Sequence, residues 1–221
     1  FGGADIIESG VKRPIQYLCL SFPNSNGGFI QGFGGETAEC VCQGLMDIFH
    51  HIGGVPRRIV FDNASGVGRR VREKVTLADL FRRFKCHYGF SVSFCNPASG
   101  HEKGHVENKV GYVRRNFFVP IPVVENLEIW NQGLLSRMEQ DFERPHYKKG
   151  LTIGELWAED RRHLSPLPAK PFLVERLDRV RTNGYGKFCF DGRHWYSSVP
   201  EYADRQMAVG IRAHTVVVYG E

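Results

Sequence analysis

Two acidic residues stand where their carboxylates could share a metal ion. Asp62 follows the short apolar run of residues 59–61, and Glu107 follows the Gly-, Pro- and Ser-containing stretch of residues 96–104. An Asp at the end of a strand and a Glu near the start of a helix can hold the same divalent cation. Carboxylate oxygens are hard ligands that suit Mg²⁺ or Mn²⁺. This pair therefore predicts metal-assisted phosphoryl transfer, with nucleic acid as the substrate class.

Positive charge gathers around the same two residues. The formal net charge of the chain is +5, yet residues 57–115 alone carry 13 Lys and Arg against 5 Asp and Glu. A solvated surface accounts for these charges when they are taken alone, but their position around two carboxylates favours a nucleic-acid footprint. Four basic residues along or beside the helix of Glu107 are expected to contact phosphate: Lys103, Lys109, Arg114 and Arg115. For each of them, a charge that simply faces solvent is the equally weighted alternative. Asn63 could orient Asp62 or contact DNA, and an ordinary turn-forming Asn is the alternative.

The elements expected around these residues alternate between strands and helices. Turn residues separate two strands in a first hairpin, and hydrophobic spacing and capping signals mark the helices that follow. The expected order is strands at 15–22 and 29–33, a helix over 37–51, a strand at 58–61, a basic loop at 65–72, a helix over 77–84, a strand at 91–94, and a helix containing Glu107. This order predicts an α/β fold with a mixed sheet, whose site lies at the carboxyl ends of the later strands.

The character of the chain changes after Pro120. A long amphipathic helix is expected from Leu127 to Phe142, and Thr152 begins a second, shorter helix with a capping box. A Pro-rich linker at 165–171 leads to four short strands, which predict a small all-β barrel or sandwich. The expected domains are therefore residues 1–120, a helical connector over 121–165, and a β-barrel over 166–221.

Other features narrow the class of protein. The sequence has no apolar run long enough to cross a membrane, and its six cysteines are scattered rather than spaced for zinc or a disulfide framework. Free thiols in a reducing cytosol are the expectation.

Several short motifs together match a known family. They are Asp-Asn-Ala-Ser at 62–65, Asn-Pro-x-Ser at 96–99, Gly-x-x-Glu at 104–107, Arg-Pro-His-Tyr-Lys at 144–148, and His-x-Tyr-Ser-x-x-Pro at 194–200. The chain resembles DDE transposases and retroviral integrases, and most closely the bacterial insertion-sequence transposases of the IstA type. The resemblance covers essentially the whole chain.

The resemblance implies a fold, an activity and partners. The fold would be an RNase H-like mixed five-stranded sheet with flanking helices, followed by a DNA-binding barrel. The activity would be metal-dependent nicking and strand transfer of insertion-sequence DNA, with Asp62 and Glu107 as catalytic ligands of a two-metal Mg²⁺ or Mn²⁺ site. Partners would be element ends and target DNA, further copies of the chain, and an AAA+ helper ATPase, in the bacterial cytoplasm at the nucleoid.

The family's metal site requires a further catalytic Asp besides Asp62 and Glu107. In the family, the first catalytic Asp stands just before Phe-Gly, and this sequence opens with Phe1 and Gly2. That Asp would lie upstream, Asp5 has no geometric reason to replace it, and the chain could be inactive as it stands. Glu102 and Glu107 point about 140° apart on one helix, so they cannot both face the metal. We favour Glu107 because a Gly precedes it by three residues, as the family motif requires.

Two other functions stay open at this point. Residues 101–105 spell His-Glu-x-x-His, the motif of zinc peptidases, with Glu125 as a third ligand. Gly104 would weaken the helix that this site needs, and Pro120 and Pro122 interrupt the path to Glu125. The other alternative is a transposase fragment that binds DNA or assembles without catalysing a reaction.

Overall fold

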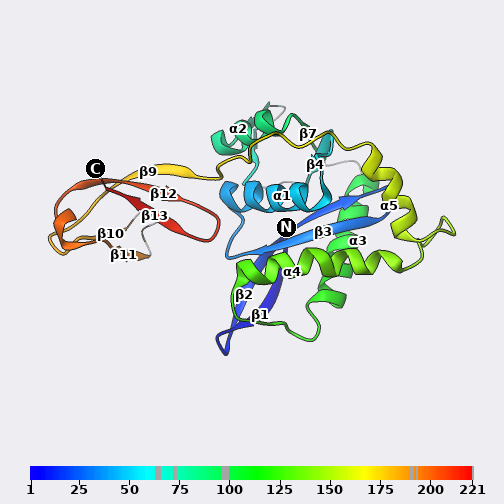
Figure 1. Cartoon of the computed structure of the whole chain (residues 1–221), viewed down its shortest axis with the longest axis horizontal. Coiled ribbons are helices and arrows are strands. Elements are labelled where there is room, and N and C mark those ends of the chain that lie inside the picture. Colours follow the sequence, from blue (N-terminus) through cyan, green and yellow to red (C-terminus); the bar gives the residue numbers. More distant parts are fainter. Residues whose placement is uncertain (63–65, 72–73, 96–99, 190–191, 193, 221) are drawn as a thin grey trace. The chain divides into compact units, whose positions relative to one another are not determined.

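The chain divides into two compact units, Phe1–Phe172 and Leu173–Glu221 (Figure 1). This computed structural model describes the chain except for residues 63–65, 72–73, 96–99, 190–191, 193 and 221. It also leaves undescribed the side chains of residues 69–71, 74–75 and 100–107. The domain boundaries expected from the sequence remain a prediction.

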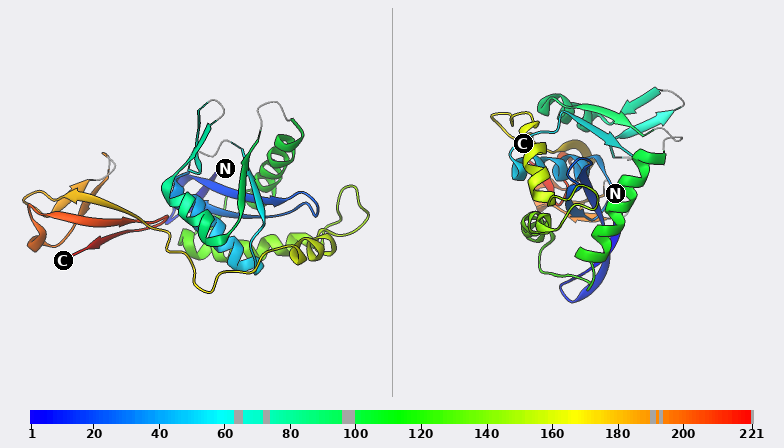
Figure 2. Two further views of the ribbon diagram at one scale, coloured as in Figure 1. Left: turned by 90° about the horizontal axis from the view of Figure 1, so that it is seen from above. Right: turned by 90° about the vertical axis from the view of Figure 1, so that its right-hand side faces the viewer.

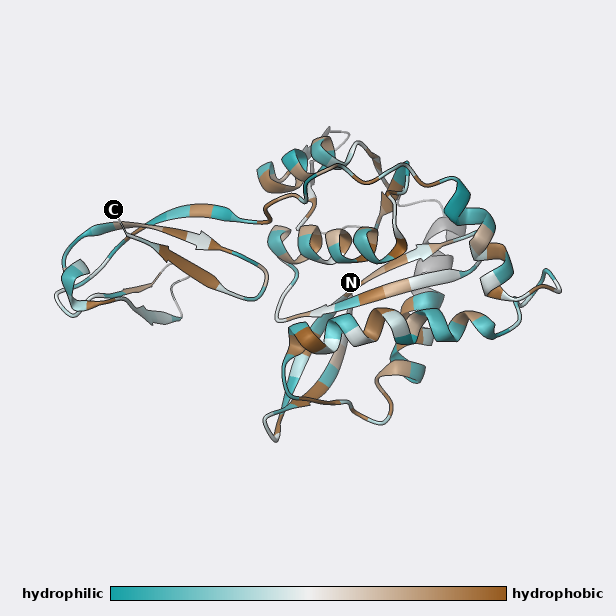
Figure 3. Cartoon of the chain, in the orientation of Figure 1, coloured by the Kyte–Doolittle hydropathy of each residue, from teal (hydrophilic) through white to brown (hydrophobic). Residues whose placement is uncertain are grey.

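An antiparallel meander forms the centre of unit 1. Its strands are β1 (Gly2–Glu8), β2 (Val11–Phe22) and β3 (Gly27–Phe33), and a short strand, β8 (Val123–Val124), runs parallel to β1. The spatial order is β3-β2-β1-β8. Alternating side chains of β2 face opposite sides of this sheet, as the pleat requires. Figure 3 shows apolar residues along these strands and on the neighbouring helix α1.

Helices cover both faces of the meander. On one face, α1 (Ala38–Ile52) packs against Leu18, with Gly44 allowing the close approach. On the other face, α3 (Gly100–Phe117) and α4 (Leu127–Gln140) pack around Tyr17 and Gly32. The sheet is thus the middle layer between helices.

A second, parallel pair of strands carries the sequence around Asp62. Strand β4 (Arg58–Phe61) pairs with β7 (Ser91–Phe94), and α2 (Asp79–Tyr88) connects them. Phe61 meets Phe81 of α2 edge to face, at a ring-centroid distance of 5.4 Å. The expected five-stranded sheet is not confirmed, because β4 and β7 form a separate two-stranded sheet within the described residues. The α/β class itself is confirmed.

The segment expected as a basic loop at 65–72 is partly a strand. Gly68–Val71 is β5, which pairs antiparallel with β6 (Lys74–Leu77). Arg and Gly residues gave no periodic pattern here, so the sequence did not reveal the strand. Both views of Figure 2 place this hairpin at the same end of unit 1 as the start of α3.

Helix α4 also closes the free edge of the sheet. The Asn131 side chain accepts from the backbone N–H of Gly32 at 2.7 Å and donates to the Gly32 carbonyl at 2.9 Å. Asn131 is only 3% exposed. One amide side chain therefore replaces the neighbouring strand that β3 lacks on this side.

Two shorter helical segments follow α4. They are the 3₁₀ turn η1 (Asp141–Glu143) and α5 (Ile153–Arg162). Thr152 and Glu155 form the capping box expected from the sequence. Within the described part of the chain, no helix is both long and apolar enough to cross a bilayer.

In the described part of unit 2, the elements are strands and one 3₁₀ turn. Strands β9 (Arg176–Arg181), β12 (Gln206–Ile211) and β13 (Val216–Tyr219) form one sheet, and β10 (Lys187–Cys189) pairs with β11 (Trp195–Ser197). The 3₁₀ turn is η2 (Pro200–Tyr202). The buried core consists of Val180, Phe188, Met207 and Val209. A closed barrel is not confirmed, since the described strands form two separate small sheets.

Candidate functional site

Asp62 lies where two parallel strands end together. It is exposed and follows β4 directly, and Phe61 pairs with Phe94 at the end of β7. The Cys95 N–H donates to the Phe61 carbonyl at 2.9 Å, so the pairing continues to the residue before Asp62. From Cys95 the chain passes through residues 96–99, outside the described part, and enters α3 at Gly100. The strand that carries Asp62 and the approach to the Glu107 helix therefore share one edge.

Helix α3 is continuous through Gly104. The expectation that this glycine weakens the helix concerns stability, and it stays a prediction. Glu102 and Glu107 both lie on α3, so the two positions point about 140° apart around its axis. Their side chains, like that of Lys103, lie outside the described part, and so does Asn63 altogether.

The turn of α3 after Glu107 presses directly on the sheet at two glycines. A Cβ built on Gly2 of β1 would lie 2.7 Å from Val110, and one built on Gly28 of β3 would lie 2.6 Å from the Cε of Lys109. Contacts that close do not occur in real structures, so β1 has no room for a Cβ at Gly2, and a Cβ at Gly28 would displace the end of the Lys109 side chain. The Tyr17 hydroxyl of β2 donates to the Val110 carbonyl at 3.0 Å and fixes the helix further.

Lys109 is buried rather than presented to solvent. It is 3% exposed, and its Nζ donates to the Asn26 carbonyl at 2.7 Å. Burial lowers the pKa of Lys109 to about 8, which reflects the cost of an ammonium group away from water. This lysine was predicted to contact DNA phosphate. We remove it from that set, because its amine is turned into unit 1 and bonded to a backbone oxygen.

Arg114 and Arg115 fit the prediction of an accessible basic pair better. Both are exposed near the end of α3. Burial raises the pKa of the Tyr17 hydroxyl, and the charge of Arg114 beside it acts in the opposite direction. Their contact with DNA remains a prediction.

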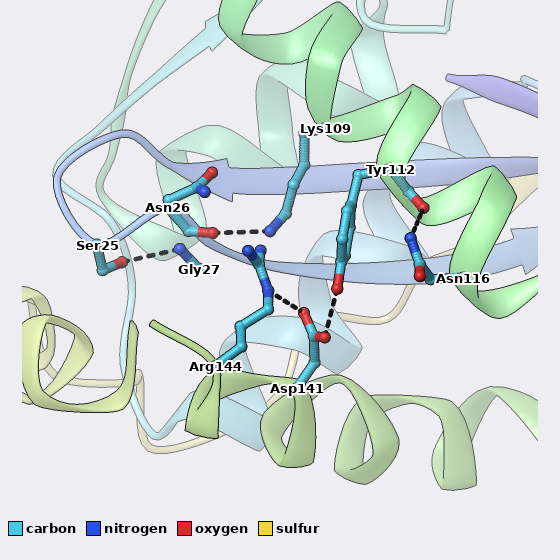
Figure 4. A network of polar contacts seen from close by, with 8 residues as sticks. All are labelled: Ser25, Asn26, Gly27, Lys109, Tyr112, Asn116, Asp141 and Arg144. Atoms are coloured by element: carbon cyan, nitrogen blue, oxygen red, sulfur yellow. Dashed lines mark hydrogen bonds and ion pairs between the residues drawn. The ribbon is translucent and has the colours of Figure 1, made fainter. Parts of the chain in front are cut away.

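A polar network joins the far half of α3 to η1 (Figure 4). The Tyr112 hydroxyl donates to Asp141 Oδ1 at 2.5 Å, and Arg144 Nε donates to Asp141 Oδ2 at 2.9 Å. The Arg144 guanidinium also lies 4.3 Å from the centre of the Tyr112 ring. Burial and the bond to Asp141 raise the pKa of Tyr112 to about 12. The sequence analysis missed Asp141 and Tyr112, because neither belongs to a motif and their contact spans 29 residues.

The carboxylates predicted to bind a metal ion are those of Asp62 and Glu107. Among the residues whose side chains are described, no group of three His, Cys, Asp or Glu could hold a metal ion. Glu107 is outside that search. The donor set nevertheless fits a hard divalent cation, because both candidate ligands are carboxylates and the exposed Asp62 is accessible to an ion.

The sequence of this chain is similar to those of known transposases. A transposase of Aminobacter aminovorans is 33% identical over 95% of this chain and 41% of its own length. A putative transposase for an insertion sequence element of Geobacillus stearothermophilus is 32% identical over 93% of this chain and 51% of its own length. This chain is a relative of the insertion-sequence transposases. The resemblance inferred from the short motifs is thereby confirmed, and the chain spans about half the length of these relatives or less.

Two further comparisons add little. No family model matches the chain. A chain from the simian T-cell lymphotropic virus intasome, solved with the PP2A regulatory subunit B56 gamma, aligns over 99% of this chain and 77% of its own length. That alignment has 14% identity and a TM-score of 0.49, so nothing is built on it.

The relatives also bear on the peptidase alternative. The His-Glu-x-x-His motif does lie on a regular helix, because α3 runs unbroken from Gly100. Helix geometry therefore gives no reason to reject a zinc peptidase. The similarity to transposases over nearly the whole chain is what disfavours it.

Proposed function

We propose that this chain is the catalytic part of a DDE-type transposase, which nicks insertion-sequence DNA and joins its ends to target DNA. The observation that carries the proposal is the shared edge of β4 and β7, with Asp62 at the end of one strand and the Glu107 helix following the other. Similarity to transposases over 95% of the chain supports it. In this interpretation the meander and the β4–β7 pair are parts of one RNase H-like core.

Asp62 and Glu107 would hold Mg²⁺ or Mn²⁺. When bound, the metal would activate a water or 3′-hydroxyl nucleophile and neutralise charge on the phosphate and the leaving oxygen. The protein's part is to place two carboxylates from different elements at one point and to present DNA beside them. Helix α3 can hold Glu107 in place because the turn of α3 that follows Glu107 packs against the sheet at Gly2 and Gly28.

DNA would be held by exposed basic residues. Arg114 and Arg115 are the described candidates, and Asn63 and Lys103 remain candidates from the sequence. Unit 2 would be a DNA-binding domain of barrel type. The protein would act as a multimer on paired DNA ends, with an AAA+ helper ATPase as partner. It would work at the bacterial nucleoid.

Catalysis is tested by replacing the two carboxylates. In the full-length transposase, Asp62→Asn and Glu107→Gln should each abolish Mn²⁺-dependent nicking and joining of a labelled duplex to plasmid DNA. Glu102→Gln is the matched control on the same helix and should retain activity. Full activity of Glu107→Gln together with loss in Glu102→Gln would reassign the ligand. Full activity of both Asp62→Asn and Glu107→Gln would refute the proposed catalytic role.

The proposed phosphate contacts are tested by a salt titration of DNA binding. Arg114→Gln and Arg115→Gln should each weaken binding and lower the slope of log K against log salt by about 1. Lys12→Gln, which removes an exposed lysine paired with Asp5 on the β1–β2 hairpin, is the control of equal charge. Slopes equal to that of the unmodified protein would remove both arginines from the DNA surface.

A further inference from the structure

Two polar side chains of α3 attach the half that follows Glu107 to other parts of unit 1. The first is Lys109, whose buried amine binds the Asn26 carbonyl in the β2–β3 turn. The second is Tyr112, whose hydroxyl binds Asp141 of η1. Figure 4 shows both attachments on the same side of the helix, facing the β2–β3 turn and η1. A further bond, from the Tyr17 hydroxyl to the Val110 carbonyl, holds the same stretch to β2, whereas the bond from Asn116 to the Tyr112 carbonyl stays within α3.

Each attachment is itself held in place. Arg144 binds the second oxygen of Asp141 and covers the Tyr112 ring, so the carboxylate has two donors and one orientation. The β2–β3 turn is fixed from outside the sheet: Asp160 accepts from the Ser25 N–H at 3.1 Å, and Lys149 Nζ donates to the Asn24 carbonyl at 2.8 Å. Both lines of contact lead into the segment after α4.

We propose that Lys109 and the Tyr112–Asp141 pair are positioning residues that set the rotation and height of α3, and through it the place of Glu107. The segment from η1 to α5 then acts as a brace for the catalytic helix, and not only as a connector. A helix fixed on one side at positions 109 and 112 cannot rotate about its axis without breaking a buried contact. This inference rests on the proposed role of Glu107 as a metal ligand.

The test compares conservative variants with a matched control. Tyr112→Phe removes the hydroxyl and keeps the ring. Lys109→Met removes the amine and keeps most of the side-chain volume. Tyr147→Phe makes the same chemical change as Tyr112→Phe at a side chain that is 66% exposed. Mn²⁺ binding is measured by electron paramagnetic resonance, and amide hydrogen exchange is measured along α3 and, as an internal reference, along α1. Thermal unfolding of every variant confirms that it is folded at the assay temperature.

The expected result is a change confined to α3 and the metal. Tyr112→Phe and Lys109→Met should weaken Mn²⁺ binding about tenfold, the scale on which groups that orient a ligand affect metal affinity. Exchange in α3 should accelerate while α1 is unchanged, and Tyr147→Phe should change neither quantity. Nicking should recover in part at saturating Mn²⁺, which a variant that is merely unstable would not do.

Two outcomes separate this inference from the proposed function. If Glu107→Gln leaves Mn²⁺ binding unchanged, the proposed metal role of Glu107 fails, whatever the other variants do. If Glu107→Gln weakens Mn²⁺ binding but Tyr112→Phe and Lys109→Met alter neither Mn²⁺ binding nor exchange in α3, the positioning role is overturned and the proposed function stands.

Discussion

Replacing Asn131 by Leu should destabilise unit 1 strongly. The side chain is 3% exposed and provides the partners of both the N–H and the carbonyl of Gly32 on the outer side of β3. Leucine fills a similar volume but leaves both backbone groups buried without a partner. Each such group costs about 1–3 kcal/mol, so the expected loss for the two is about 2–6 kcal/mol. For a unit of this size the melting temperature should fall by roughly 5–15 °C.

Thermal and urea unfolding of Asn131→Leu would measure this loss, with Gln132→Leu as control. Gln132 is the next residue of α4 and is exposed, so its replacement should shift the melting temperature by less than about 2 °C. Asn131→Asp should fall between the two, since a carboxylate can still accept from the Gly32 N–H but cannot donate to the carbonyl. A melting temperature of Asn131→Leu equal to that of Gln132→Leu would refute the reasoning that this amide replaces a strand at the edge.

Three further predictions concern other buried groups. Burial raises the pKa of Asp47 to about 6, so the folded state binds more protons than the unfolded state between about pH 4 and 6. Stability should therefore fall as pH rises through that window. Asp47→Asn should be more stable than the unmodified chain by about 1–3 kcal/mol at pH 7, and the two should be equally stable near pH 3. Urea unfolding at both pH values measures this difference. Equal stability at pH 7 would contradict the prediction. Gly28→Ala should cost about 1–3 kcal/mol and accelerate amide exchange in α3, because its Cβ would displace Lys109; unchanged exchange would show that the helix accommodates it. In unit 2, Glu175 is 7% exposed and binds Arg212 Nε at 2.8 Å, so Arg212→Ala should lower the melting temperature of that unit, with exposed Arg205→Ala as its reference.

Local signals in the sequence predicted the elements that carry the candidate site. Thr37 caps α1 by accepting from the Cys40 N–H, and Gly53 ends it in the left-handed region at φ 74°. The strands that precede Asp62 and residue 96 also have the predicted bounds, 58–61 and 91–94. These features depend on contacts within a few residues, and a sequence shows such contacts directly.

Features that depend on distant contacts were missed. Strand β1 begins with two glycines and includes Asp5, a composition that does not suggest a strand. It forms because β2 pairs with it along its whole length. Lys109 was taken as a surface charge because lysine is rarely buried, and the space that accepts it exists only where Gly28 lies beneath α3. The pairing of strands into sheets is equally non-local, so the five-stranded sheet could be expected only by resemblance.

Three buried or partly buried polar contacts of unit 1 have a common feature that no short motif of the sequence reveals. Asn131 joins α4 to the edge of β3, Asp141 joins η1 to α3, and Asp160 joins α5 to the β2–β3 turn. Each of these contacts links the segment after residue 126 to the sheet or to the helix of Glu107. Hydrogen bonds of this kind fix orientation, which apolar packing alone leaves less well defined. A segment that the sequence presents as a connector therefore has the contacts needed to keep α3 in one orientation, and the proposed sharing of a cation by Glu107 and Asp62 depends on that orientation.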